Sequence, residues 1–346
     1  MQNKVVSKQD LVNFVDSLIR KKAAEEIVGV KASDGKYAFG ELANATELYL
    51  DYDVTLLPPK KYFLPPRETV LRFELGDKPS VEPVVEAKSI ILIGVHPYDI
   101  KAIELCDAVY GSTDPPDPNY LLKRERATII GVDCLNPNPK AFCSSLGTAA
   151  VESGFDLMLT DIGDSYVVAV GTDKGGKLLK KYAKTKEATE SELAQRDSQR
   201  KQALGKYAVS LSMPAQEVPE LLEAGWDSPV FKEKSDTCLS CGSCVMVCPT
   251  CVCFDVQDDV ALTLDKGERY RQWDGCMLVD FAKVATGENF REDREKRFRH
   301  RMYRKGVYLM ARYGKLGCVG CGRCALACLA QIASPAEVFN LLKEAS

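Results

Sequence analysis

Two cysteine runs constrain this chain more than any other feature of its sequence. The first has the spacing C-x2-C-x2-C-x3-C-P, and it is made by Cys238, Cys241, Cys244, Cys248 and Pro249. The second repeats the cysteine spacing and has a leucine in place of the proline, at Cys318, Cys321, Cys324, Cys328 and Leu329. Bacterial ferredoxins hold [4Fe–4S] clusters through thiolates at this spacing. Structural zinc is the weaker alternative, because zinc sites use paired knuckles with four ligands in total.

The two runs are expected to share their ligands. In two-cluster ferredoxins the fourth cysteine of each run serves the other cluster. The predicted ligands of the first cluster are therefore Cys238, Cys241, Cys244 and Cys328. Those of the second are Cys318, Cys321, Cys324 and Cys248. Glycines at 242, 320 and 322 permit the close turns that such ligand loops need.

Length and composition place these runs in a larger globular protein. The chain has 346 residues, 45% of them hydrophobic and 27% charged, which allows two or three domains with sizeable cores. A net charge of −3 favours neither nucleic acid nor an anionic membrane as partner. No apolar stretch reaches the ~20 residues of a membrane span, and Asp10 and Asp16 interrupt any export signal, so we expect a cytoplasmic protein. Fourteen cysteines in that compartment indicate metal ligands rather than disulfides, and oxygen-labile clusters suggest an anaerobe.

The rest of the chain predicts an α/β domain before the cluster domain. Continuous apolar runs at Ser89–Val95 and Thr128–Val132 flank a helix expected from Pro97, which makes a β-α-β unit. A Gly-Asp turn at 163–164 predicts a hairpin. We expect an irregular α+β region over 1–84, the α/β domain over 85–173, a helical linker over 174–230 and an α+β, two-cluster ferredoxin-like domain over 231–346.

Further segments carry a family resemblance. The most specific are AFCSSLGT, CPTCVC and WDGCM followed by GENFRE. Over about residues 85–328 the chain resembles the iron–sulfur β-subunits of soluble sulfhydrogenases, the ferredoxin-like subunits of anaerobic sulfite reductases and related subunits of flavin oxidoreductases that serve heterodisulfide reductases. It departs from the family at His96-Pro97-Tyr98-Asp99, where Arg-Pro-Cys-Asp is common.

The resemblance implies an electron-transfer subunit of a larger oxidoreductase. Such a subunit relays electrons between a partner that binds FAD and NAD(P)H and a separate catalytic subunit of hydrogenase, sulfite reductase or heterodisulfide reductase type. No nucleophile–base set is visible, which argues against catalysis by this chain alone. The alternative is a stand-alone sulfur- or sulfite-reducing enzyme that uses Cys251 or Cys253 as a reactive thiol or open-site ligand.

Four cysteines in the family-like segments lie outside the two runs: Cys143, Cys251, Cys253 and Cys276. We hypothesise that they hold a third [4Fe–4S] cluster where the α/β and cluster domains meet. Zinc at the same thiols and simple burial are the alternatives. Cys134 could replace Cys143 as a ligand, and Cys106 is predicted to be a core residue.

Two remaining signals are weaker. Residues 291–305 contain eight Lys or Arg, which favours a solvated helix, with a docking face or a positive counter-field for anionic clusters as alternatives. Residues 171–177 fit G-x4-G-K but lack the hydroxyl residue of a phosphate loop, so they predict a strand-to-helix connection.

Overall fold

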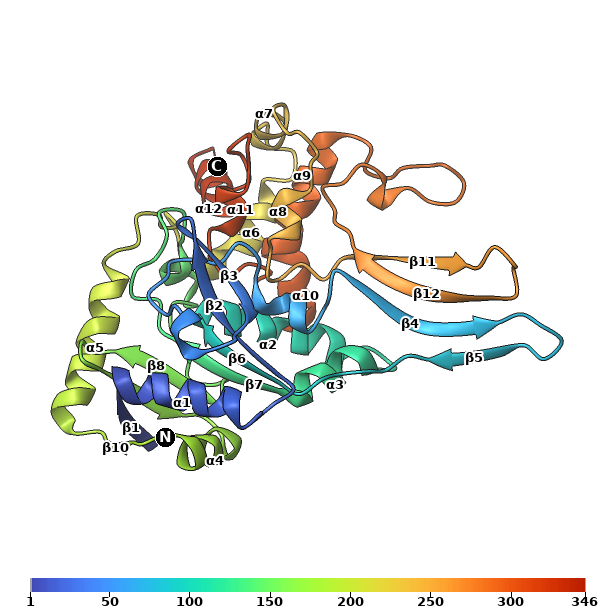
Figure 1. Ribbon diagram of the computed structural model, residues 1–346. Helices are drawn as coiled ribbons and strands as arrows, with labels where there is room; N and C mark the ends of the chain where they lie inside the picture. The colour runs from blue at the N-terminus through green and yellow to red at the C-terminus, as the bar shows by residue number, and fades with distance from the viewer. Residues whose placement is uncertain (1, 346) are drawn as a thin grey trace.

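A computed structural model describes residues 2–345 and contains two β-sheets and a helical C-terminal part (Figure 1). The larger sheet has eight strands in the order β10-β1-β9-β8-β7-β6-β2-β3. Strands β2, β6, β7 and β8 are parallel, and the others pair antiparallel. The strands are β1 (Gln2–Ser7), β2 (Glu26–Ser33), β3 (Lys36–Glu41), β6 (Ile90–Val95), β7 (Ala127–Val132), β8 (Leu157–Asp161), β9 (Ser165–Val170) and β10 (Lys186–Glu187).

The predicted β-α-β unit and hairpin are present at the centre of this sheet. Every residue of β6 and β7 is buried, as expected for parallel strands covered on both faces. The flanking helices are α1 (Lys8–Arg20), α2 (Pro97–Gly111), α3 (Pro118–Arg126), α4 (Asp173–Tyr182) and α5 (Glu190–Leu204). The 171–177 segment forms the predicted strand-to-helix connection, with the Thr172 hydroxyl accepting from the Gly175 amide at the start of α4.

The expected boundaries near residues 84 and 174 do not divide this sheet. Strand β2 pairs in parallel with β6, and β1 pairs with β9, so the N-terminal residues belong to the same sheet as the β-α-β unit. Helices α4 and α5 contact β9, and β10 adds an edge strand, so residues 173–204 brace the sheet rather than link two domains. Local sequence patterns miss this because strand pairing joins segments far apart in the chain.

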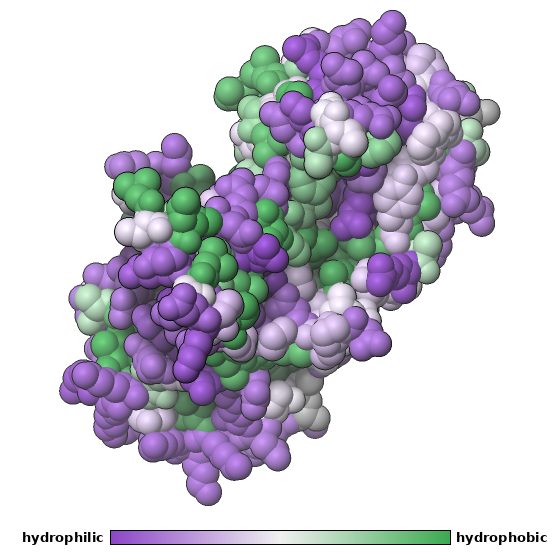
Figure 2. Space-filling model, turned by 90° about the vertical axis from the view of Figure 1, so that its right-hand side faces the viewer, coloured by the Kyte–Doolittle hydropathy of each residue, from purple (hydrophilic) through white to green (hydrophobic). Residues whose placement is uncertain are grey.

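The smaller sheet joins two segments that lie far apart in the sequence. Its order is β11-β12-β4-β5, and all its pairs are antiparallel. The strands are β4 (Arg67–Glu74), β5 (Ser80–Pro83), β11 (Phe254–Val260) and β12 (Lys266–Trp273). Buried Arg271 anchors the sheet by ion pairs to Glu68 and Asp117. The sheet projects from the body (Figure 1), and the surface on that side mixes hydrophobic and hydrophilic patches (Figure 2).

The C-terminal part is built from short helices around a second apolar core. They are α6 (Val218–Ala224), α7 (Val230–Ser235), α8 (Ser243–Met246), α9 (Arg294–Tyr303), a π-helical turn (Arg304–Tyr308), α10 (Leu309–Tyr313), α11 (Arg323–Leu326) and α12 (Pro335–Glu344). Short 3-10 turns occur at Ala45–Glu47, Pro59–Tyr62, Cys143–Leu146, Ala215–Glu217 and Asp280–Ala282. Among residues 2–345, no helix has both the length and the apolar character needed to cross a membrane.

Candidate iron–sulfur sites

The two cysteine runs form a structural repeat in which each residue of the first run corresponds to the residue 80 positions later. Gly242 and Gly322, with φ of 72° and 76°, directly precede the short helices α8 and α11. Ser240 and Gly320 also have positive φ, and their amides lie 3.4 and 3.5 Å from the Sγ atoms of Cys238 and Cys318. Helices α8 and α11 pack against each other. The equal spacing therefore produces two equal ligand loops, side by side.

The first site is a small hollow at the surface. The cysteines that line it are Cys238, Cys241, Cys244 and Cys328. Cys241 is exposed, and a hydrogen bond with the Ser243 hydroxyl lowers the pKa of its thiol. Burial raises the pKa of Cys244 to about 12. The structure thus brings the last cysteine of the second run to the thiols of the first.

The second site lies deeper, against the α/β part of the molecule. Cys248, Cys321 and Cys324 are buried, and Cys318 is half-buried. Burial raises the pKa of Cys318 and of Cys321 to about 12. The charges of the neighbouring Cys324 and Cys248 also raise the pKa of both thiols. Cys248 therefore lies with the second run, as the ligand-sharing prediction requires.

Buried cations from one helix face these thiols. The Lys305 ammonium donates to Cys248 Sγ at 2.8 Å and to the Thr250 hydroxyl at 2.8 Å. Burial alone would raise the pKa of Cys248, but Lys305 leaves it lowered. Arg301, one turn earlier, is 1% exposed and bonds the Ala333 carbonyl, while its Nε and Nη1 atoms have no partner among the described residues.

The solvated-helix interpretation of residues 291–305 is therefore wrong for one face of α9 and the π-helical turn that continues it. Arg297, Arg301 and Lys305 recur every four residues and are all buried, so their side chains point inward. The Arg301 guanidinium interacts electrostatically with thiols of both sites. Its strongest such interactions are with Cys244 of the first site and Cys324 of the second. The four-residue spacing was visible in the sequence and could have identified this face.

These features fit [4Fe–4S] clusters. Buried cations without acidic partners are costly unless a negative charge offsets them, and thiolate-ligated clusters supply that charge. A single zinc ion would need its sulfurs about 2.3 Å from one point. Within residues 2–345, no three His, Cys, Asp or Glu side chains converge closely enough to hold one metal ion. A group of four irons is held by four thiolates that lie farther apart than the ligands of one ion.

The four additional cysteines do not form one group. Cys251, Cys253 and Cys276 lie together: a hydrogen bond from the Cys253 thiol lowers the pKa of Cys251, and burial raises the pKa of Cys276 to about 11, with Cys251 as the next cause. Buried Lys60 donates to the Cys251 carbonyl at 2.9 Å. Asp274 is adjacent, since its amide lies 3.4 Å from the Cys253 carbonyl and the charge of Cys251 acts on its carboxyl.

Cys143 lies instead beside the second run. A Cβ on Gly320 would meet the Cys143 backbone nitrogen at 2.7 Å, and Cys143 packs with Cys134 and Cys321 in a small apolar cluster. Burial raises its pKa well above the ordinary value. Cys134 belongs to the same small apolar cluster as Cys143. Cys106 packs in the main core of the α/β part, as expected. The structure therefore separates Cys143 from its three predicted co-ligands.

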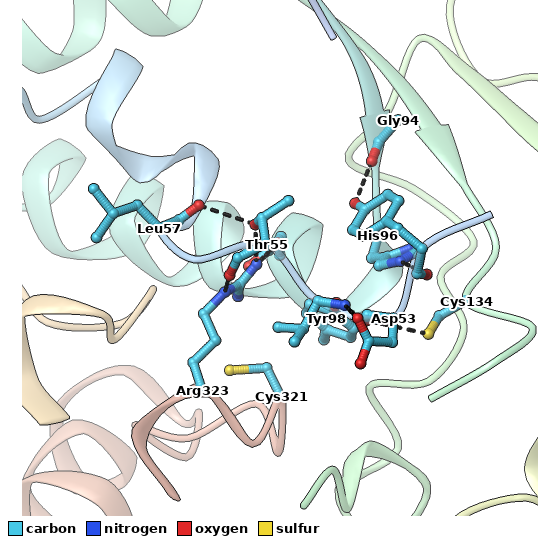
Figure 3. Close-up of polar contacts among 12 residues, drawn as sticks. Asp53, Thr55, Leu57, Gly94, His96, Tyr98, Cys134, Cys321 and Arg323 are labelled. Atoms are coloured by element: carbon cyan, nitrogen blue, oxygen red, sulfur yellow. Dashed lines mark hydrogen bonds and ion pairs between the residues drawn. The ribbon is translucent and has the colours of Figure 1, made fainter. Parts of the chain in front are cut away.

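An ion pair that the sequence did not reveal joins the second site to the α/β part. The guanidinium of Arg323, between Cys321 and Cys324, contacts both carboxylate oxygens of Asp99 at 2.7 Å. It also donates to the carbonyl and hydroxyl of Thr55, each at 2.8 Å (Figure 3). Nearby His96 is buried between the carbonyls of Val132 and Tyr52, at 3.0 and 3.1 Å, which is a structural role.

Comparisons with known proteins find a matching domain and a relative. A family model described as a 4Fe-4S dicluster domain matches residues 237–332. The chain is 36% identical over 308 residues to a protein named sulfhydrogenase 2 subunit beta from Pyrococcus furiosus. That similarity spans 88% of this chain and 90% of the relative.

Proposed function

This chain belongs to the iron–sulfur β-subunit family of sulfhydrogenases, as its motifs indicated, and we propose that it relays single electrons between a flavin subunit that uses NAD(P)H and a separate catalytic subunit. Its iron–sulfur character and the family support an electron-transfer role in an oxidoreductase complex. The catalytic partner would be of hydrogenase, sulfite reductase or heterodisulfide reductase type.

The observation that carries the proposal is the pair of repeat-related cysteine sites packed together through α8 and α11. We assign Cys238, Cys241, Cys244 and Cys328 as ligands of one [4Fe–4S] cluster. We assign Cys318, Cys321, Cys324 and Cys248 as ligands of the other. A bound [4Fe–4S] cluster supplies one-electron chemistry whose potential depends on charge, hydrogen bonds to sulfur and solvent exposure.

The protein's own side chains set the conditions at these sites. Lys305 donates to Cys248, and Arg301 places a positive charge that acts on thiols of both sites. Both cations offset the negative charge of the thiolates and favour the more negative, reduced state. Burial of the second site excludes water from Cys321 and Cys324. These roles are those of an electron carrier, and they do not require a substrate pocket.

A third cluster remains part of the proposal, with altered ligands. Cys251, Cys253 and Cys276 are the three grouped thiols, and Asp274 is the nearest carboxylate donor to them. Analysis of iron in the anaerobically purified chain distinguishes the cases: about twelve irons support three clusters, and about eight support two. Substitution of Cys276 by serine would then remove about four irons, while Cys143→Ser would remove none.

The relay function is tested in the assembled complex. Hydrogen or NAD(P)H should reduce the clusters of this chain only when the partner subunits are present. Electron paramagnetic resonance monitors the reduction. The isolated chain should accept electrons from dithionite and pass them to a dye without consuming sulfur or sulfite. Substrate-dependent turnover by the isolated chain would instead establish the stand-alone enzyme that uses Cys251 or Cys253.

A further inference from the structure

The structural repeat places an apolar residue directly after two ligand cysteines at each site. At the first site these residues are Leu239 and Leu329, which both line the hollow. The corresponding residues at the second site, 80 positions away in the repeat, are Val319 and Pro249. The two sites can therefore be compared position by position within one chain.

The equivalent residues differ sharply in exposure. Leu239 is 61% exposed and Leu329 is 83% exposed, whereas Val319 is 5% exposed and Pro249 is buried. Single exposed leucines are common on protein surfaces. Here two of them flank the same hollow beside Cys241, the exposed thiol of that site.

The second site shows what covers these positions. Val319 packs with Tyr98, Ala102 and Cys143 of the α/β part of the chain. Pro249 shares a small cavity with Ala102, Ile103 and Cys106, and its carbonyl is 3.8 Å from Cys106 Sγ. Val319 and Pro249 are thus covered by a predominantly apolar surface of the α/β part, whereas Cys318 is half-buried and lines a neighbouring pocket. The first site presents the same apolar positions without such a cover.

From this asymmetry we infer that the mouth of the first site, defined by Leu239, Cys241 and Leu329, is the surface on which the redox-partner subunit docks. This inference rests on the proposed relay function. The partner should present an uncharged, apolar patch beside its own redox cofactor, because it replaces the kind of cover that the second site already has. An uncharged core with aromatic or aliphatic contacts is typical of lasting subunit interfaces.

The surface also suits electron exchange. Cys241 is the exposed ligand of the first site, whereas in the second site Cys318 is half-buried and Cys248, Cys321 and Cys324 are buried. A partner seated on Leu239 and Leu329 would bring its cofactor to this thiol and exclude water from it. Burial of the two leucines would add to the association free energy, since each removes apolar surface from water.

The test uses the complex isolated through a tag on this chain. In the variant Leu239→Lys/Leu329→Lys, two buried charges would oppose docking, so the affinity for the redox-partner subunit should fall at least tenfold by native mass spectrometry. Reduction by NAD(P)H or hydrogen should fall with it. Iron content and reduction by dithionite should stay unchanged. Leu204→Lys is the matched control, because Leu204 is 50% exposed at the end of α5 and does not line the hollow of the first site.

A second variant, Leu239→Gln/Leu329→Gln, adds no charge beside the thiols. If the lysine variant loses iron, the glutamine variant tests whether the two leucines bind the partner. Undiminished partner affinity in the glutamine variant, with full iron content, would overturn the inference. So would a wild-type homodimer that the variants dissociate while the partner is retained, because the occupant would then be a second copy of this chain. If the wild-type complex itself is not reduced by NAD(P)H or hydrogen, the relay function fails, and loss of partner affinity in the variants still reports on the surface.

Discussion

Lys305 is the single side chain with the most direct influence on a ligand thiol. Its ammonium contacts Cys248 at 2.8 Å in a fully buried setting. We predict that Lys305→Met lowers the midpoint potential of the second site, because the reduced state loses a compensating positive charge. A charge pair about 4 Å apart at an effective dielectric of about 20 is worth on the order of 4 kcal/mol, which corresponds to roughly 170 mV for one electron. Redox titration followed by electron paramagnetic resonance measures the shift.

Lys296 is the matched control for Lys305, because it lies in α9, directly before the turn that carries Lys305, with a largely exposed side chain paired to Asp293. Lys296→Met should leave both potentials unchanged. Equal shifts in the two variants would mean that net charge, and not the contact with Cys248, sets the potential.

His300 makes stability depend on pH. Burial, followed by the charges of Arg291 and Arg304, lowers its pKa to about 4 from the ordinary 6.5. Below about pH 6.5 the unfolded chain binds this proton and the folded chain does not, so stability present above that pH is lost progressively as pH falls toward 4. We predict that the melting temperature falls less between pH 7 and 5 in His300→Gln than in the wild type. Parallel curves for the two chains would assign the acid sensitivity to other groups, including the clusters.

At the scale of elements, the two ligand loops differ in how closely other backbone approaches them. Gly320 has φ of 67°, and a Cβ there would lie 2.7–2.9 Å from backbone atoms of residues 142 and 143. Its equivalent, Ser240, carries a side chain at φ of 52°. The second loop is therefore docked against the segment that contains Cys143, and only glycine allows that contact.

We predict that Gly320→Ala destabilises the protein by about 2–4 kcal/mol, because backbone strain adds to overpacking. Gly314→Ala isolates the strain, since Gly314 has φ of 66° with nothing within 4 Å of its Cβ position, and it should cost only about 1 kcal/mol. Urea unfolding under anaerobic conditions measures both. Equal losses of stability in the two variants would show that the 142–143 segment moves aside for the added methyl group without a further loss of stability.

At the scale of the whole molecule, the Arg323–Asp99 pair connects the cluster part to the α/β part. Both side chains are almost completely buried. Removing one partner of a buried pair leaves an uncompensated charge and typically costs about 3–5 kcal/mol. We predict this loss for Asp99→Asn, with most of it recovered in the double variant Asp99→Leu/Arg323→Met. Thermal unfolding of the iron-loaded protein is the measurement.

Glu104→Gln provides the comparison on the same helix, because Glu104 pairs with Lys101 in a more exposed position. The stability lost in Glu104→Gln should stay within about 1 kcal/mol. A similar small loss for Asp99→Asn would indicate that hydrogen bonds to Thr55 alone hold Arg323 in place.

The sequence by itself determined what depends on local spacing. Two runs of four cysteines specified two ligand loops, because the backbone between ligands is too short to be arranged in many ways. Apolar runs around 90–95 and 127–132 specified buried parallel strands. The hairpin at 163–164 followed from its turn residues in the same way.

Only the tertiary structure decided which distant residues meet. It separated Cys143 from Cys251, turned Arg301 and Lys305 toward the thiols, and paired Asp99 with Arg323 across 224 positions of the chain. It also covered Val319 and left Leu239 exposed, although the two occupy equivalent positions in the repeat. Such contacts depend on how strands pair and how the two parts of the molecule pack, and short-range patterns in the sequence carry no record of that packing.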